Sequence, residues 1–91
     1  MPRFFIEVPH LSDAMSCVEA AEIFVRTGSH FLTRADWGCM DGEHKAWIIV
    51  DVETKEDARA IVPPAYRSQA RIVQLTTFSQ AQVAELRRQH S

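Results

Sequence analysis

Four residues of this chain combine the chemistry of a small-molecule site: Arg34, Asp36, Trp47 and Asp51. An arginine beside two carboxylates and an aromatic wall can hold an anionic or enol-like ligand and transfer a proton. If the segments that carry these residues pair as a hairpin, Asp36 lies opposite Trp47, and Arg34 lies diagonal to Trp47 and Asp51. The pattern predicts Arg34, Asp36 and Asp51 as catalytic residues, with Trp47 and the neighbouring His30 binding the ligand. The other interpretation is a set of ion pairs that fixes the register of a dimer.

A second candidate site is metal-binding, and its residues are Cys39 and His44. They are cross-strand neighbours in the same hairpin, and thiolate and imidazole suit soft or borderline metals such as Zn, Ni or Cu. Two ligands are too few for a tight site, so a dimer would have to complete the shell, or His30, Asp36 or Asp41 would have to contribute. Nothing in the sequence places His10 near the pair. The cofactor is therefore either absent or one transition metal. The alternative is a half-buried thiol beside a surface histidine, since nucleophilic catalysis by Cys39 lacks an evident third residue.

Tyr66 and Arg67 follow the stiff pair Pro63-Pro64 and are a third set of candidates. A loop anchored by two prolines could place Tyr66 and Arg67 over a ligand, where the guanidinium would bind a carboxylate. The simpler interpretation is an ordinary crossover loop.

The composition excludes several classes of protein. Of 91 residues 46% are apolar, and twelve acids against ten bases give a formal charge of −2. The chain is therefore not disordered, carries no basic excess for nucleic acid, and lacks an apolar run long enough for a membrane span. Cys17 and Cys39 form no disulfide framework, so Cys17 is expected to be a small core residue. These features, with an N-terminus unlike a signal peptide, predict a cytoplasmic location.

Local signals define the secondary structure. Strands are predicted over residues 3–8, 30–40, 44–51 and 71–77, with Asp41-Gly42 as the hairpin turn. Helices are predicted over residues 16–27, 55–62 and 79–90. The first helix carries a capping box, Ser16 with Glu19, although Ser12 or Asp13 could also start it, and Gly28 would end it. Thr54 and Ser79 cap the other two helices, and Pro63-Pro64 ends the second.

The turn fixes which residues share a face of the hairpin. Paired positions sum to 83, so Trp37 faces Ala46 and Cys39 faces His44. One mostly apolar face should take the helices, and it carries Phe31, Thr33, Ala35, Trp37, Cys39, His44, Ala46, Ile48, Val50 and Val52. The other face mixes apolar and charged groups, and it carries Phe5, Glu7, His30, Leu32, Arg34, Asp36, Lys45, Trp47, Ile49, Asp51 and Gln74.

The order of elements predicts a single α+β domain over residues 1–91. A β-α-β-β-α-β chain is the ferredoxin-like arrangement, with an antiparallel sheet in the order 4-1-3-2, both main helices on one face and an extra C-terminal helix. The bare second face and the short chain favour a homodimer.

Residues 3–78 resemble the dimeric α+β barrel group in element order and spacing. This group includes muconolactone isomerase-like proteins, small cofactor-independent monooxygenases and a small family with a nickel-binding member. Residues 28–47 resemble the last family's helix end, strand and hairpin, residues 48–52 and 54–58 its strand and helix start, and residues 71–75 its closing strand. The resemblance implies two sheets facing each other across a lumen, and it assigns no ligand or catalytic residue. The sequence thus predicts a dimer that binds a small molecule, with isomerase-type proton transfer; the alternatives are a metal-binding module and a structural or regulatory dimer.

Overall fold

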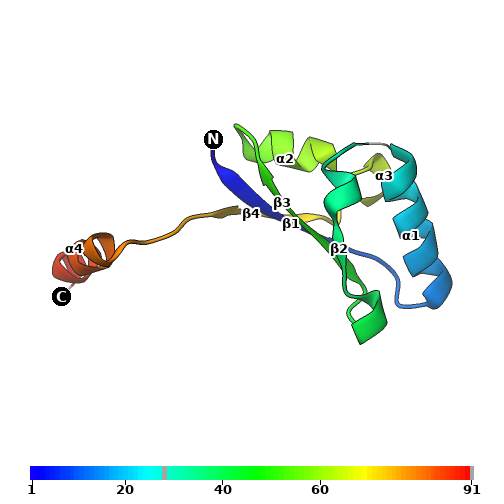
Figure 1. Ribbon diagram of the computed structural model, residues 1–91, viewed down its shortest axis with the longest axis horizontal. Helices are drawn as coiled ribbons and strands as arrows, with labels where there is room; N and C mark the ends of the chain where they lie inside the picture. The colour runs from blue at the N-terminus through cyan, green and yellow to red at the C-terminus, as the bar shows by residue number, and fades with distance from the viewer. Residues whose placement is uncertain (28, 91) are drawn as a thin grey trace.

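The computed structural model describes residues 1–27 and 29–90, so Gly28, the predicted helix end, lies outside the described residues. The chain forms an α+β domain (Figure 1). Its elements in chain order are β1 (Arg3–Pro9), α1 (Ala14–Thr27), the 3₁₀ turn η1 (Leu32–Arg34), β2 (Asp36–Trp37), the 3₁₀ turn η2 (Cys39–Asp41), β3 (Lys45–Asp51), α2 (Lys55–Ile61), α3 (Pro64–Arg67), β4 (Arg71–Leu75) and α4 (Gln80–His90).

The strands form a four-stranded antiparallel sheet in the order β2-β3-β1-β4. Read from its other edge, the same sheet runs β4-β1-β3-β2. The strand β1 is central, so Phe5 pairs with Ile49 of β3 on one side and with Val73 of β4 on the other. The end of β1 therefore lies beside the start of β3, where Pro9 pairs with Lys45.

The second strand is much shorter than predicted. Only Asp36 and Trp37 pair with β3, although their partners Trp47 and Ala46 are those that the sequence predicted. Residues 32–34 form a 3₁₀ turn, because the Ser29 carbonyl accepts the amides of Leu32 and Thr33 at 3.1 and 3.2 Å. The turn rotates Leu32 into the core, where it is 1% exposed, so its prediction on the open face is wrong.

The predicted two-residue hairpin turn is also wrong. The connection between β2 and β3 runs through η2, and Gly42 follows that turn with a φ of 81°. The Gly38 carbonyl accepts the amides of both Asp41 and Glu43 at 3.0 and 2.9 Å, which closes a longer loop. Cys39 and His44 consequently belong to this loop rather than to a strand pair.

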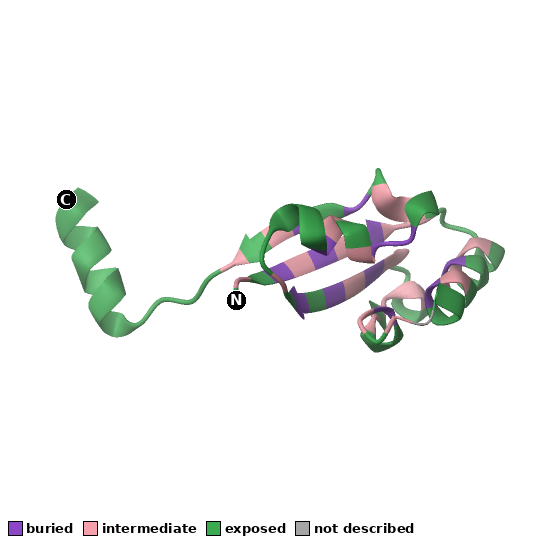
Figure 2. Ribbon diagram, turned by 90° about the horizontal axis from the view of Figure 1, so that it is seen from above, coloured by how far each residue is buried: buried purple, intermediate pink, exposed green. Residues whose placement is uncertain are grey.

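The hydrophobic core lies on one face of the sheet, as the alternating buried and exposed bands of the strands show (Figure 2). The sheet contributes Phe4, Ile6, Val8, Ala46, Ile48, Val50 and Ile72. The connecting segments contribute Phe24, Leu32, Ala58, Val62 and Ala70. Burying these side chains removes apolar surface from water and supplies the main stabilisation of the fold.

Within residues 1–27 and 29–90 no helix covers the second face of the sheet, which is called here the open face: Phe5, Glu7, Lys45, Trp47, Ile49, Asp51, Val73 and Leu75. Its central Ile49 is 58% exposed. Gln74 was predicted on this face, but it pairs with Phe4 and therefore belongs to the other one. The local sequence does not indicate which face of this strand is turned toward the core, because that depends on its register with β1.

Side-chain caps set where the helices begin. The helix α1 begins at Ala14, and Asp13 rather than Ser16 caps it, accepting the Ser16 amide and hydroxyl at 2.8 Å each. Thr54 caps α2 as predicted, accepting the Asp57 amide at 3.0 Å. Ser79 and Gln82 cap α4 reciprocally.

The C-terminal helix α4 extends away from the rest of the molecule on an extended segment (Figures 1 and 2). Residues 76–90 are exposed throughout. This arm gives the chain its elongated dimensions of 51 × 28 × 20 Å.

Candidate metal centre

Three side chains with metal-ligating atoms converge beside the hairpin loop: His10, Cys39 and His44. One donor atom from each lies within 4.8 Å of the other two. Cys39 and His44 lie in the loop between β2 and β3, whereas His10 follows β1, far from that loop in the sequence. Two imidazoles and a sulfur are donors that Zn, Ni and Cu accept.

The pairing of β1 with β3 brings the two histidines together. One step beyond the Pro9–Lys45 pair, the His10 amide donates to the His44 carbonyl at 3.0 Å. The rings of His10 and His44 then meet edge to face, with centroids 5.7 Å apart. Nothing in the sequence around His10 indicated that it lies near Cys39, so His10 was not predicted to be a metal ligand.

Hydrogen bonding gives the His10 ring a defined orientation. Its Nδ1 lies 2.8 Å from the Leu11 carbonyl oxygen, which can only accept, so Nδ1 carries the proton. The other nitrogen, Nε2, therefore has its lone pair free in the neutral ring, and it lies 3.2 Å from the Cys39 sulfur. A backbone carbonyl that fixes the tautomer in this way is the usual outer contact of a metal-binding histidine.

His44 carries a buried polar atom without a partner. Its Nδ1 is shielded from solvent and makes no hydrogen bond. An unsatisfied buried nitrogen costs about 1–3 kcal/mol, and native structures rarely retain one without a function. A metal ion that His44 bound through this nitrogen would satisfy it.

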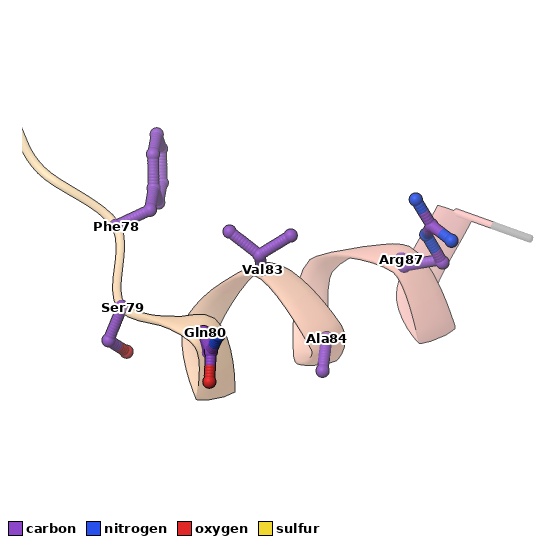
Figure 3. Close-up of a pocket in the computed structure, with 6 residues that line it drawn as sticks. All are labelled: Phe78, Ser79, Gln80, Val83, Ala84 and Arg87. Carbon is purple, nitrogen blue, oxygen red and sulfur yellow. The ribbon is translucent and has the colours of Figure 1, made fainter.

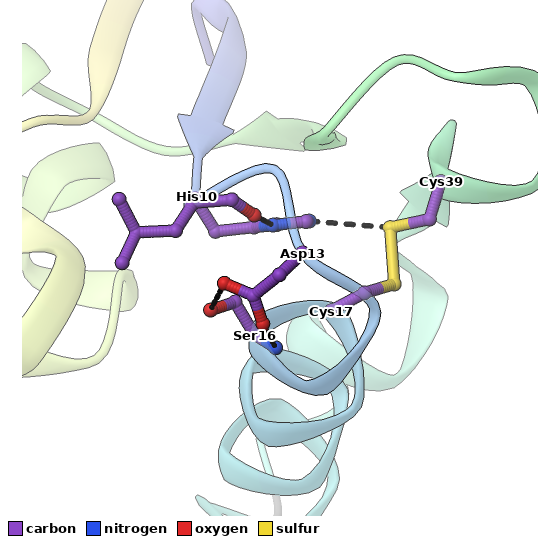
Figure 4. Close-up of a disulfide and its surroundings, with 6 residues drawn as sticks. His10, Asp13, Ser16, Cys17 and Cys39 are labelled. Atoms are coloured by element: carbon purple, nitrogen blue, oxygen red, sulfur yellow. Dashed lines mark hydrogen bonds between the residues drawn. A yellow bond between two sulfur atoms is a disulfide. The ribbon is translucent and has the colours of Figure 1, made fainter.

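The two cysteines form a disulfide, Cys17–Cys39, which joins the first turns of α1 to η2 (Figure 4). This corrects the predictions that no disulfide forms and that Cys17 is simply a core residue. Their Cα atoms lie 6.6 Å apart although 22 positions separate the residues in sequence, and only the packing of α1 beside the loop creates this proximity. Asp13 fixes the start of α1 four residues before Cys17, and the hydrogen bonds from Ser16 lower the pKa of the Asp13 carboxyl.

The site lies between the core and the solvent. On its inner side the Trp37 ring lies 4.9 Å from Phe24 and 6.1 Å from His10, between centroids. On its outer side Met40, next to Cys39, is fully exposed. His10, Cys39 and His44 are themselves only partly buried, so the site is open to solvent in part.

The structure separates the residues of the predicted small-molecule site. Asp36 and Trp47 are neighbours across β2 and β3. Arg34 belongs to η1 and is exposed, outside the sheet, because the predicted strand is a turn there. Asp51 pairs with Arg3 at the far end of β3, about 13 Å from Trp47 by strand rise.

Trp47 instead takes part in a polar group on the open face. Its indole nitrogen donates to Glu7 at 3.1 Å, and the Lys45 ammonium lies 3.8 Å from the same carboxylate oxygen. The ring covers Gly38, where a Cβ would lie 2.6 Å from the indole. Gly38 was not singled out from the sequence, since no local pattern marks a glycine under an aromatic ring.

The remaining predicted ligand-binding residues have other partners. His30 is exposed and stacks on Phe31, with ring centroids 4.1 Å apart. Tyr66 packs against Phe24, with ring centroids 6.1 Å apart. Burial, and to a smaller extent the negative charge of Glu19, raises the pKa of the Tyr66 hydroxyl. Arg67 donates to the Ala60 and Val62 carbonyls at 2.9–3.1 Å, and so caps the end of α2.

The surface is also hollowed elsewhere. One pocket lies between the extended segment and α4, lined by Phe78, Ser79, Gln80, Val83, Ala84 and Arg87 (Figure 3). Another lies on the outer side of α1, lined by Val18, Ala21, Glu22, Val25 and Arg26. Neither contains a residue that the sequence predicted to be functional.

Among the residues that the structure describes, no helix has the length and apolar character needed to cross a membrane. Comparison of the chain with protein-family models, with curated proteins and with solved structures yields no match, so the function has to be argued from the site itself.

Proposed function

We propose that this chain is a metal-binding module for a divalent transition metal, with His10, Cys39 and His44 as ligands. The observation that carries the proposal is the convergence of three donor atoms within 4.8 Å, two from the loop between β2 and β3 and one from the end of β1. The unpartnered His44 Nδ1 beside the cluster supports it. Cys39 acts as a ligand when it is a thiolate, which requires the reduced protein.

The donor set favours Zn²⁺ or Ni²⁺ over hard ions such as Mg²⁺. Ligand atoms around a tetrahedral zinc lie roughly 3.3–3.8 Å apart, given Zn–N and Zn–S bonds of about 2.0–2.3 Å. The cluster, at up to 4.8 Å, therefore has to contract by about 1 Å. Side-chain rotation supplies a movement of that size without any change in the sheet.

Metal titration of the reduced protein tests the proposal. Tag-free protein in a phosphine reductant should bind one Zn²⁺ or Ni²⁺ per chain, measured by competition with a chromophoric chelator and by elemental analysis. His10→Ala and His44→Ala should each weaken binding on the order of a hundredfold. The matched control is His30→Ala, which removes an exposed imidazole outside the cluster. A reduced protein that ignores Zn²⁺, Ni²⁺ and Cu²⁺ in both assays would refute the proposal.

We further propose that the protomer is ferredoxin-like and pairs with a second copy through its open face, as in the dimeric α+β barrel group. The strand and helix order supports the first part. The apolar side chains of the open face support the second: Ile49 is exposed, and Phe5, Val73 and Leu75 beside it are only partly buried.

We also propose a cytoplasmic location. In that reducing compartment the thiol form of Cys39 would predominate, which suits a metal-binding module.

The open face is a second candidate site, for a small anionic molecule. The specific observation in its favour is the Trp47–Glu7–Lys45 group, which combines an aromatic wall, a carboxylate and an ammonium. A second copy would enclose this group in a lumen, where isomerase-type proton transfer by Glu7 or Asp36 could occur. Thermal stabilisation by small carboxylates, lost in Lys45→Met, tests this candidate; a melting temperature that no carboxylate changes counts against it.

A further inference from the structure

We propose that Cys17 is the fourth ligand of this site, so that the Cys17–Cys39 disulfide and a Cys₂His₂ metal centre are two alternative states of one redox switch. This inference rests on the proposed metal-binding function and adds its regulation. The observation behind it is that the disulfide shares a sulfur with the metal cluster: the Cys39 sulfur is bonded to Cys17 and lies 3.2 Å from His10 Nε2 (Figure 4).

The disulfide holds a fourth donor next to the cluster. The Cys17 sulfur is not among the atoms that lie within 4.8 Å of one another, but its bonded partner, the Cys39 sulfur, is. Because the Cys17 sulfur is bonded to the Cys39 sulfur, it lies within a bond length of the cluster that His10, Cys39 and His44 form. In a tetrahedral zinc site the two sulfurs lie about 3.8 Å apart. Reduction therefore has to separate them by less than about 2 Å, which rotation about the cysteine side-chain bonds provides.

The charge also favours four ligands over three. Two thiolates neutralise a divalent cation, and two neutral imidazoles complete the shell, so the centre has no net charge. With Cys39 as its only thiolate, the complex would keep one positive charge beside the Trp37 and Phe24 rings of the core.

The two states exclude each other chemically. A dithiol reductant gives two electrons and two protons to the disulfide; the Cys17–Cys39 bond breaks, two thiols form, and the dithiol becomes a disulfide. The metal ion then displaces the two thiol protons and binds both thiolates. In reverse, exchange with a small disulfide removes two electrons from the thiolates and releases the ion, because sulfurs bonded to each other no longer act as thiolate ligands.

Either state ties α1 to η2, so the switch keeps the fold. The disulfide joins the two elements covalently, and the metal would join them through the same two sulfurs. The reduced, metal-free chain alone lacks both links. The switch therefore changes what the site holds without requiring the sheet to rearrange.

Cobalt and zinc titrations of the full chain test the inference. Reduced wild-type protein should give the intense near-ultraviolet band of cobalt bound by two thiolates, and the oxidised protein should bind at least a hundredfold more weakly. Cys17→Ser should keep a weaker site with a single-thiolate band of about half the intensity. Val18→Ser, one position later and on the exposed outer side of α1, is the matched control and should behave as wild type in cobalt binding.

Alkylation followed by mass spectrometry provides a readout that needs no variant. In the reduced wild-type protein, Zn²⁺ should slow the modification of Cys17 as strongly as that of Cys39. If Zn²⁺ protects Cys39 and leaves Cys17 reactive, or if Cys17→Ser binds as tightly as wild type, the fourth ligand is refuted and the three-ligand function stands. If the oxidised protein binds as tightly as the reduced one, the switch is refuted. If the reduced protein binds no metal, the proposed function itself fails.

Discussion

At the scale of single residues, the candidate centre depends on the ring nitrogens of His10 and His44. The Leu11 carbonyl fixes the proton of His10 on Nδ1 and directs Nε2 at the Cys39 sulfur. His44 Nδ1 is buried without a partner. One histidine is thus oriented, and the other has an unused donor atom, which is the arrangement a metal ion would use.

Gly38 supports the Trp47 ring, and its substitution tests how tightly that contact is packed. In Gly38→Ala the new Cβ would lie 2.6 Å from the indole and 2.8 Å from the Glu43 Cβ. We expect the free energy of unfolding to fall by about 1–3 kcal/mol, because the ring or the loop must move. Urea denaturation measures the change. Gly42→Ala has open space and only a backbone penalty at φ 81°, about 1 kcal/mol, so a larger loss there than at Gly38 would contradict this account.

Asp13 makes the stability of the fold depend on pH in the acid range. Hydrogen bonds from Ser16 lower the pKa of this carboxyl in the folded chain. The stabilisation is therefore fully present above the ordinary carboxyl pKa of about 4, and it is lost as the pH falls through the lowered folded value. We expect Asp13→Asn, which keeps a capping side chain but no charge, to be less stable than wild type at neutral pH and to lose less stability below about pH 4. Thermal unfolding at pH values between about 2 and 7 measures the stability curves of both proteins. Parallel curves would disprove the contribution of the Asp13 charge.

At the scale of elements, the important contact is the one between α1 and η2. It joins two segments separated by 22 positions, and a disulfide closes the intervening loop. The loop contains β2 and η1, so it carries the whole edge of the sheet next to β3. The crosslink consequently restricts the unfolded chain more than a local bridge would.

Removing the disulfide should destabilise the metal-free protein. A closed loop of this length corresponds to about 3 kcal/mol of unfolded-state entropy. We expect Cys17→Ser/Cys39→Ser, or a reductant together with a chelator, to lower the free energy of unfolding by that amount. Denaturation with and without the reductant measures it, and the double variant should show no response to the reductant. Equal stability of the oxidised and reduced chains would mean that the bridge restricts nothing.

At the scale of the whole molecule, one face of the sheet is covered and the other is not. The helices and turns bury one set of alternating side chains, whereas Ile49 at the centre of the open face is 58% exposed. Apolar surface of this kind, rimmed by Glu7, Lys45 and Asp51, is typical of an interface between protein chains. The candidate metal centre lies at the end of β1 rather than on this face, so the two surfaces can function independently.

The oligomeric state tests the open face. If two copies pair through it, Ile49→Glu should convert a dimer into a monomer, because it places a charge in the apolar centre of the interface. Light scattering coupled to gel filtration measures the mass of both proteins. The control is Val25→Glu, a substitution of similar chemistry on the outer side of α1. A monomeric wild-type protein, or a variant that stays dimeric, would contradict the pairing.

The sequence by itself determined the features that have local causes. The alternation of apolar residues predicted β1 and β3, Thr54 predicted the start of α2, and the positions around the hairpin predicted the pairing of Asp36 with Trp47. It did not predict η1 and η2, because backbone hydrogen bonds to Ser29 and Gly38 overrode the strand propensity of their neighbours. Those turns moved Leu32 into the core and removed Arg34 from the sheet.

The sequence also named two of the candidate metal ligands, Cys39 and His44, since they are close in the chain and their donor atoms are typical metal ligands. Only the tertiary structure decided what joins them. His10 arrives 29 positions away through the pairing of β1 with β3, and Cys17 arrives through the packing of α1 against the loop. Contacts of this separation depend on how the whole chain buries its apolar surface, and no local pattern of residues encodes them.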